Sequence, residues 1–244
     1  MKIEIWSDVV CPWCYIGKRR LEAALSTFAH RDEVEVAWRA FELDPSAPAE
    51  RPGPYVDRLA RKYGVPVAEA QAMIDQMTAA AADEGLVFRF DIARPGSTFD
   101  AHRLLHLALG RGRQDALKER LLAATFSEGQ PIGDRSALVQ LAGEVGLDPE
   151  EARAVLDSDA FADEVRADEA IAADLGVSGV PFFVIDRTYA VSGAQPADVL
   201  LRVLERAWTR GPARPVVMAG GDETAGCDGD GCALGPQPAA EASS

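Results

Sequence analysis

The N-terminal part of the chain alternates between strand-like and helical patterns of hydrophobic positions. Residues 2–7 (KIEIWS) place hydrophobic and polar side chains in turn, which is typical of a half-buried strand. Residues 15–29 repeat hydrophobic side chains at roughly helical spacing, and residues 33–41 (EVEVAWRAF) alternate again. The pattern predicts a β-α-β unit, whose two strands normally lie parallel and are joined by a right-handed crossover.

A long helical pattern follows a proline-rich break at residues 45–54 and lasts to about residue 174. Within it, only LVFRF at 86–90 has the composition of a short strand. Glycine and proline divide the remainder into several helices of ordinary length, which predicts an all-helical insertion. These breakers occur at 64–66, 95–96, 129–131 and 148–149.

The pattern then returns to strands. Residues 176–186 (GVSGVPFFVID) predict a turn and a buried strand, residues 188–193 a second strand, and residues 196–208 a closing helix. From residue 211 onward Gly, Pro, Asp, Ala and Ser dominate, and we expect a flexible tail. The predicted organisation is an α/β protein with a discontinuous domain of residues 1–52 and 175–210, a helical insertion of residues 53–174, and a tail of residues 211–244.

Composition and charge narrow the function classes. A chain of 244 residues can bury a sizeable core, so its four cysteines are not needed as structural staples. The net charge of −14 disfavours nucleic acid and anionic membranes as partners. We expect no secretion signal and no membrane span, because the chain begins with a strand pattern and no apolar run reaches about 18 residues. The expected compartment is the cytoplasm, where thiols are kept reduced.

The candidate chemistry lies in CPWC, which joins the first strand to the first helix. A thiol at a helix start is stabilised as thiolate by unpaired backbone N–H groups and by the helix dipole, and Cys11 has that position. Pro12 suits the first helical turn, and Cys14 is near enough to resolve a mixed disulfide. We therefore expect Cys11 to be the exposed nucleophile, with its pKa depressed to about 4 to 7.

Other interpretations of these residues stay open at this stage. Cys11 and Cys14 could form half of a zinc site with Cys227 and Cys232 as the other half, although Pro-Trp before an amphipathic helix is unusual for a zinc knuckle. The two thiols could also be inert core cysteines. His102 and His106, four residues apart on a predicted helix, could in principle ligate a metal, but packing is favoured and no metal site is predicted.

Several segments together resemble the DsbA-like thioredoxin-fold proteins and, within them, the FrnE-like branch: WSDVVCPWCYIG, VAWRAFEL, FDAHRLLHLA (99–108) and GVPFFVID (179–186). The resemblance covers about residues 1–210. It implies a thioredoxin fold with an inserted helical domain and a cis peptide bond between Val180 and Pro181, in a loop that faces the dithiol. It also implies a substrate surface that includes Pro12, Trp13 and Val180, with His102 near the cleft.

The function predicted from these observations is thiol-disulfide exchange by the CPWC dithiol. No cofactor is expected beyond the redox-active disulfide, with a low-molecular-weight thiol as electron partner and thiol- or disulfide-containing proteins as substrates. Trp13 replaces the His of strongly oxidising relatives, so we expect a potential between about −120 and −270 mV. Two alternatives remain. One is a glutathione-dependent isomerase or transferase of the kappa or 2-hydroxychromene-2-carboxylate type, whose members carry Ser in place of Cys11. The other is a holdase chaperone.

The second cysteine pair, Cys227 and Cys232, lies in the predicted tail within AGCDGDGCALG. Because a coil can span a small domain, these thiols could exchange with CPWC as a secondary redox pair. Asp228 and Asp230 should disfavour thiolates nearby and raise the pKa values of the pair.

Overall fold

The computed structural model describes residues 1–210, 216–218, 226–228 and 231–233. Its first elements confirm the predicted β-α-β unit. β1 (Lys2–Ser7) and β2 (Glu35–Ala40) lie parallel, with Ile5 opposite Trp38, and α1 (Pro12–Thr27) connects them. A short 3₁₀ turn, η1 (Arg31–Glu33), precedes β2.

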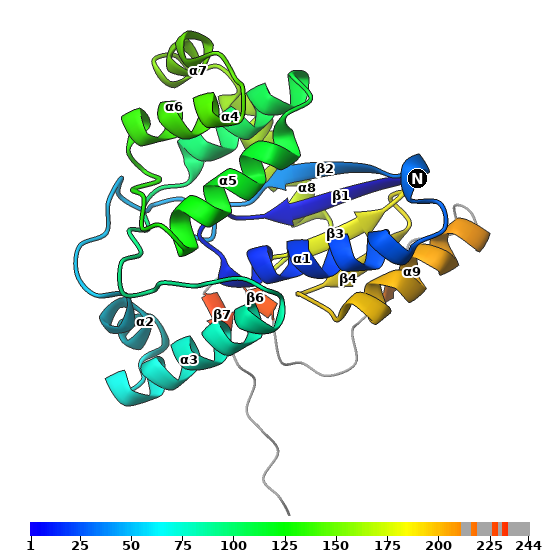
Figure 1. Ribbon diagram of the computed structural model, residues 1–244, viewed down its shortest axis with the longest axis horizontal. Helices are drawn as coiled ribbons and strands as arrows, with labels where there is room; N and C mark the ends of the chain where they lie inside the picture. Colours follow the sequence, from blue (N-terminus) through cyan, green and yellow to red (C-terminus); the bar gives the residue numbers. More distant parts are fainter. Residues whose placement is uncertain (211–215, 219–225, 229–230, 234–244) are drawn as a thin grey trace, which may run out of the picture.

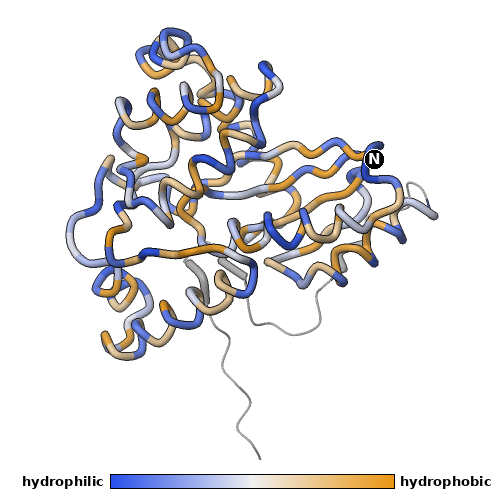
Figure 2. Tube along the Cα trace, viewed as in Figure 1, coloured by the Kyte–Doolittle hydropathy of each residue, from blue (hydrophilic) through white to orange (hydrophobic). Residues whose placement is uncertain are grey.

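The C-terminal strands complete the sheet. β3 (Phe182–Ile185) pairs antiparallel with β1 and with β4 (Tyr189–Ser192), and β5 (Val216–Met218) adds parallel to β4. The sheet order is β2-β1-β3-β4-β5. α1 and α9 (Ala197–Arg210) run side by side on one face of this sheet (Figure 1). Hydrophobic residues concentrate along the central strands (Figure 2), where they form a core with these two helices.

Seven helices lie between β2 and β3 in the sequence, in agreement with the predicted helical insertion. They are α2 (Tyr55–Tyr63), α3 (Val67–Asp83), α4 (Phe99–Gly110), α5 (Gln114–Phe126), α6 (Arg135–Glu144), α7 (Pro149–Leu156) and α8 (Ala162–Asp174). α4 to α7 gather around their own hydrophobic core, whereas α2 and α3 share a core with the start of α1. The dithiol therefore lies where the sheet and the inserted helices meet.

Residues 86–90, which have the composition of a short strand, do not form one. Leu86, Phe88 and Phe90 are buried, which explains the alternation, but the segment pairs with no strand. One backbone bond, from Arg89 N–H to Phe126 O at 2.6 Å, fixes it to the end of α5. The alternation of hydrophobic and polar residues in this segment therefore reflects burial of one side of the segment, and not pairing in a sheet.

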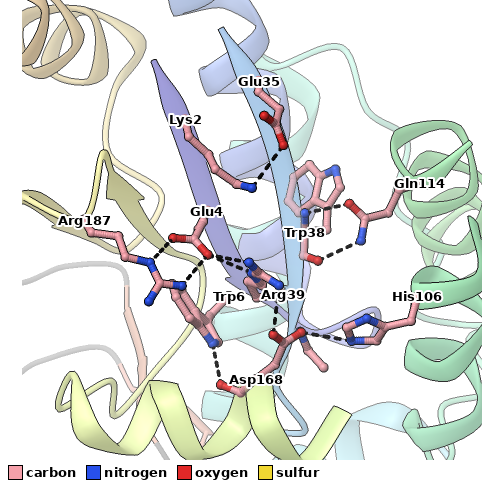
Figure 3. A network of polar contacts seen from close by, with 11 residues as sticks. Lys2, Glu4, Trp6, Glu35, Trp38, Arg39, His106, Gln114, Asp168 and Arg187 are labelled. Atoms are coloured by element: carbon pink, nitrogen blue, oxygen red, sulfur yellow. Dashed lines mark hydrogen bonds and ion pairs between the residues drawn. The ribbon is translucent and has the colours of Figure 1, made fainter. Parts of the chain in front are cut away.

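A buried polar network joins the sheet to the insertion (Figure 3). Glu4 of β1 accepts hydrogen bonds from Arg39 of β2 and from Arg187 between β3 and β4. Asp168 of α8 lies 3.2 Å from the Arg39 guanidinium, accepts the backbone N–H of Ala40 at 2.9 Å, and accepts the Trp6 indole N–H through its own carbonyl. These contacts fix α8 against the parallel pair of strands.

The predicted tail contains short strands. Besides β5, β6 (Gly226–Asp228) and β7 (Gly231–Ala233) pair antiparallel, and the register sets Cys227 opposite Cys232. The remainder of the predicted tail lies outside the described residues. Across the described part of the chain, none of the helices is both long and apolar enough to cross a membrane.

Candidate redox site

The CPWC segment is positioned by the end of β1 and the start of α1. Cys11 is the N-cap residue of α1, in an extended conformation, and Pro12 occupies the first turn, where its missing N–H costs nothing. The Cys14 N–H donates to Cys11 O at 3.1 Å. The two thiols are thus held one helical turn apart by local backbone geometry alone.

The loop before β3 faces this helix start. The Val180–Pro181 peptide bond is cis, which confirms the expectation drawn from the family resemblance. The Cys11 thiol donates to Val180 O at 3.4 Å. Close approach of the loop depends on Gly17, because a Cβ there would lie 2.9 Å from Pro181 Cγ. The structure therefore brings together Cys11, Cys14, Val180 and Pro181, which are far apart in the sequence.

The burial of the thiols differs from the sequence expectation. Cys11 was expected to be exposed at the helix start, but both thiols are 0% exposed and belong to a hydrophobic cluster that includes Trp6, Leu59 and Val180. Side chains from the insertion and from the cis-proline loop cover the helix start. Such tertiary cover leaves no periodic signal in the sequence.

The electrostatics of the pair also differ from the expectation. Burial raises the pKa of Cys11 well above its ordinary value, and negative charge on Cys14 and Asp8 raises it further. Burial opposes ionisation of Cys14 as well, yet its pKa is lowered because Cys11 hydrogen-bonds to it and the Lys118 ammonium lies nearby. The shift of the Cys11 pKa in this closed arrangement is therefore opposite in direction to the predicted depression, and Cys14 is the thiol whose ionisation its surroundings favour.

A buried charged group lies beneath the dithiol, made of Asp8, His102 and Lys118, which we call the Asp8 cluster. Lys118 of α5 is 0% exposed, its ammonium donates to Ser7 O at 3.2 Å, and burial lowers its pKa to about 8. His102 Nε2 lies 3.4 Å from Asp8 Oδ1, and Asp8 Oδ2 accepts the Leu43 N–H at 2.8 Å. Although burial opposes it, the contact with His102 lowers the pKa of Asp8.

Sequence reasoning missed two members of this cluster. Asp8 lies only three residues before Cys11, so its position in the sequence could have identified it as part of the site. Lys118 is distant in the sequence, and its pattern is that of an ordinary lysine on a helix. His102 was expected to line the substrate surface. It is 1% exposed and its Nε2 faces Asp8, so it lies on the buried face of α4 and not on a substrate surface.

His102 and His106 do not converge on a common point. His106 Nε2 lies 3.0 Å from Asp168 Oδ2, close but not aligned as a hydrogen bond, whereas His102 faces Asp8. No group of three potential metal ligands occurs in the described part of the chain. The side chains of the tail cysteines are outside the described residues, so the zinc alternative finds no described ligand set.

A cavity of about 860 Å³ opens beside CPWC. Pro12 and Trp13 form one wall, while Val180 and His102 do not line it. The remaining walls come from the loop after β2, from α2 and α3, and from residues 95–98. The helix start thus borders a space of the size that small ligands occupy.

With this geometry in view, similarity to known proteins becomes informative. The family model for the DsbA-like thioredoxin domain matches residues 2–205. The chain belongs to the DsbA-like thioredoxin family. A probable DsbA oxidoreductase from Streptomyces coelicolor is similar, with 51% identity and a TM-score of 0.83, covering 96% of this chain and 99% of that one. The uncharacterised protein YwbO of Bacillus subtilis is 30% identical over 206 residues, which are 83% of this chain and 94% of YwbO.

The DsbA-like fold is shared beyond redox enzymes. The structure of a 2-hydroxychromene-2-carboxylate isomerase matches with a TM-score of 0.61 at 15% identity, covering 86% of this chain and 95% of that one. At that identity the match concerns the fold alone. The family and fold are established by these similarities, whereas the reaction depends on the residues at the helix start.

Proposed function

We propose that this DsbA-like protein is a redox enzyme that catalyses thiol-disulfide exchange through Cys11 and Cys14. The observation that carries the proposal is the pairing of two thiols at the start of α1 with the cis Val180–Pro181 loop, 3.4 Å from Cys11 Sγ to Val180 O. The fold alone does not decide, because an isomerase shares it. The proposed compartment is the cytoplasm, in which a small thiol can act as electron partner.

The proposed reaction proceeds in two exchanges. The Cys11 thiolate attacks one sulfur of a substrate disulfide, forming a mixed disulfide, and the first substrate thiolate leaves and takes up a proton. The Cys14 thiolate then attacks the Cys11 sulfur, which forms the Cys11–Cys14 disulfide and releases the second substrate thiol. Lys118 favours this second step because its ammonium stabilises Cys14 as thiolate. The reverse sequence oxidises a substrate dithiol.

The cis-proline loop has a separate part in this proposal. Pro181 lacks an N–H, and the neighbouring backbone can pair with an extended substrate as an added strand. Val180 O accepts the Cys11 thiol in the closed arrangement. A substrate that pairs with this loop would compete for that carbonyl and release the Cys11 sulfur for attack.

The roles of the two cysteines are tested by trapping. Cys14→Ser should accumulate mixed disulfides on Cys11, since the resolving thiol is missing, and these should appear as adducts in non-reducing gels and intact-mass spectra. Cys11→Ser serves as the matched control and should trap little. The opposite result, with adducts on Cys14 in Cys11→Ser only, would make Cys14 the nucleophile, in keeping with its lowered pKa.

The same variants address the two alternative functions. A glutathione-dependent isomerase of this fold needs no second thiol, so Cys14→Ser would retain full isomerase turnover. A holdase would suppress aggregation of an unfolded client even when both cysteines are replaced. We expect instead that loss of either thiol abolishes multiple turnover in a disulfide reductase or dithiol oxidase assay.

We also propose Cys227 and Cys232 as a secondary redox pair. Directly opposed residues in antiparallel strands have Cα atoms about 4.5 or 5.5 Å apart, and both separations suit a disulfide; the register of β6 and β7 supports this pairing. Electrons would pass from this dithiol to an oxidised CPWC pair. Acid quenching and disulfide mapping should then find the tail pair oxidised after turnover. A tail pair that stays reduced while Cys227→Ser/Cys232→Ser cycles normally would rule out the relay.

A further inference from the structure

The cavity beside CPWC has fixed walls. The loop after β2 is joined to residues 95–97 by two backbone bonds, from Arg51 N–H to Pro95 O at 3.1 Å and from Ser97 N–H to Pro48 O at 2.8 Å. Gly96 permits this contact, because a Cβ there would lie 1.9 Å from Ala49 O. The far side is built by α2 and α3. Two segments that line the space are therefore joined to each other by backbone hydrogen bonds.

The charge of the lining differs in sign from that of the whole protein. The chain carries a net charge of −14, yet four cations and two carboxylates line the cavity. Both carboxylates are engaged, Asp8 by His102 and the Leu43 N–H, and Asp44 by Arg51 and Ser46. The cations are Arg51, Arg58, Arg61 and Lys62.

Arg58 of α2 is the cation whose surroundings point to a ligand. It is half-buried, and its Nη1 donates only to backbone carbonyls, those of Arg51 and Gly53. Its Nη2 is buried without a hydrogen-bond partner, and no carboxylate of the described residues lies within 4.0 Å of the guanidinium. A buried charged donor left unpaired is costly, so a ligand that supplies an acceptor would be bound favourably.

Tyr55 links Arg58 to the dithiol. The Arg58 guanidinium lies over the Tyr55 ring, 5.3 Å from its centroid. Tyr55 packs against the hydrophobic cluster that contains Cys11 and Cys14. Burial raises the pKa of the Tyr55 hydroxyl, and negative charge on Cys11 raises it further. A ligand held by Arg58 would therefore lie in the part of the cavity beside Tyr55. Cys11 is buried behind the lining residues Pro12 and Trp13, so its sulfur must become exposed before it can attack such a ligand.

We propose that this cavity binds a low-molecular-weight disulfide that carries a carboxylate, and that Arg58 binds the carboxylate while Cys11 attacks the disulfide. The inference rests on the proposed function and names its substrate class. In the half-reaction, the reduced CPWC pair gives two electrons to the substrate disulfide, and two substrate thiols and the Cys11–Cys14 disulfide result. A further thiol compound must restore the dithiol in a separate step.

The size of the site favours a small substrate over a polypeptide. A volume of about 860 Å³ lies within the range of small-ligand pockets, about 300 to 1,000 Å³. The two lining loops described above are joined by backbone hydrogen bonds, so the cavity does not widen between them unless these bonds break. The guanidinium fork also matches a single carboxylate, which it can bind through two parallel hydrogen bonds.

The test compares three disulfides with the same two-carbon arms: 3,3′-dithiodipropionate (dianion), bis(2-hydroxyethyl) disulfide (neutral) and cystamine (dication). Pre-reduced full-length protein reacts with each in a single turnover without added reductant, and alkylation followed by intact-mass measurement reports oxidised CPWC. We expect the ratio of second-order rate constants, dianion to neutral, to exceed one and to fall about tenfold in Arg58→Gln, the scale of one charge-assisted hydrogen bond. Because a change in folding or in thiol reactivity alters both rate constants alike, the ratio of the two is not affected by it.

Two further variants complete the design. Arg58→Lys keeps the charge and should restore part of the ratio, whereas Arg202→Gln removes an exposed cation of α9 outside the cavity and should leave the ratio unchanged. An unchanged ratio in Arg58→Gln, or preference for the dication, would overturn the inference. Dependence on Arg58 seen only with acidic cystine peptides would show the small-molecule assignment to be wrong. Failure of all three disulfides to oxidise wild-type CPWC would instead refute the proposed function itself.

Discussion

Two buried polar groups connect the sheet to the inserted helices, and they differ in whether they lie beside the thiols. In the network of Figure 3, both oxygens of Glu4 accept from Arg39 or Arg187, and both oxygens of Asp168 have partners. In the Asp8 cluster, both oxygens of Asp8 have partners as well. Each group also holds one buried histidine nitrogen without an aligned partner among the described residues, His106 Nε2 beside Asp168 and His102 Nδ1 beside Asp8. Only the Asp8 cluster lies next to the two thiols.

The difference indicates different uses of buried charge. A buried ion pair that is fully hydrogen-bonded fixes the position of its elements, and breaking it costs several kcal/mol. Charged groups that lie next to titrating thiols shift the pKa values of those thiols instead. The pKa of Lys118 is lowered to about 8 by burial, and that of Cys14 is lowered partly by Lys118. We therefore interpret the Figure 3 network as structural and the Asp8 cluster as functional.

The largest expected effect is loss of stability in Asp168→Asn. Removing the charge leaves Arg39 without its α8 partner beneath the sheet, and we expect the free energy of unfolding to fall by about 3 kcal/mol. Urea unfolding measures this change, and the redox potential of the remaining folded protein should match wild type. A shift in potential together with intact stability would contradict the structural interpretation.

The next largest effect that we expect is a change in the reduction potential of the CPWC pair in Lys118→Met. Without the ammonium the Cys14 thiolate loses stabilisation, so the reduced form is less favoured and the potential becomes more negative, by about 30 mV for each pKa unit lost by the pair. Titration against a glutathione buffer measures it. Lys18→Met is the matched control, because Lys18 is also buried but pairs with Glu22, Asp115 and Glu119. An equal shift in both variants would deny Lys118 a specific role.

The same variant has a signature in the pH dependence of stability. Because the pKa of Lys118 is about 8 when folded and near 10.5 when unfolded, the unfolded chain binds more protons between these values. Stability therefore gains on the order of 3 kcal/mol from this residue as the pH rises through that window. The gain should be missing in Lys118→Met. Parallel stability curves for the two proteins would show that Lys118 is not desolvated.

The sequence predicts well what depends on local pattern and less well what depends on tertiary contact. Strand alternation and helix spacing located β1, α1 and β2, and CPWC marked the helix start. The burial of Cys11 and the charge beside Cys14 were not predictable, since the covering side chains and Lys118 come from distant segments. At residues 86–90 hydrophobic and polar residues alternate although the segment is not part of a sheet, because a segment can bury one side without pairing with a strand.

The smallest effect separates two roles for Asp8. Its negative charge raises the pKa of Cys11, although less than burial and Cys14 do. Asp8→Asn keeps the shape and removes the charge, so the pKa of Cys11 should fall by less than about one unit, with stability changed less than in Asp168→Asn. The pH dependence of iodoacetamide alkylation in Cys14→Ser and Cys14→Ser/Asp8→Asn measures the pKa of Cys11.

If Asp8 instead serves as the proton acceptor of the dithiol, single-turnover rates with a neutral disulfide should drop in Asp8→Asn although Cys11 ionises more easily. Faster alkylation with slower turnover would thus reassign Asp8 from a charge that tunes Cys11 to a base, and would strengthen the contrast with Asp168.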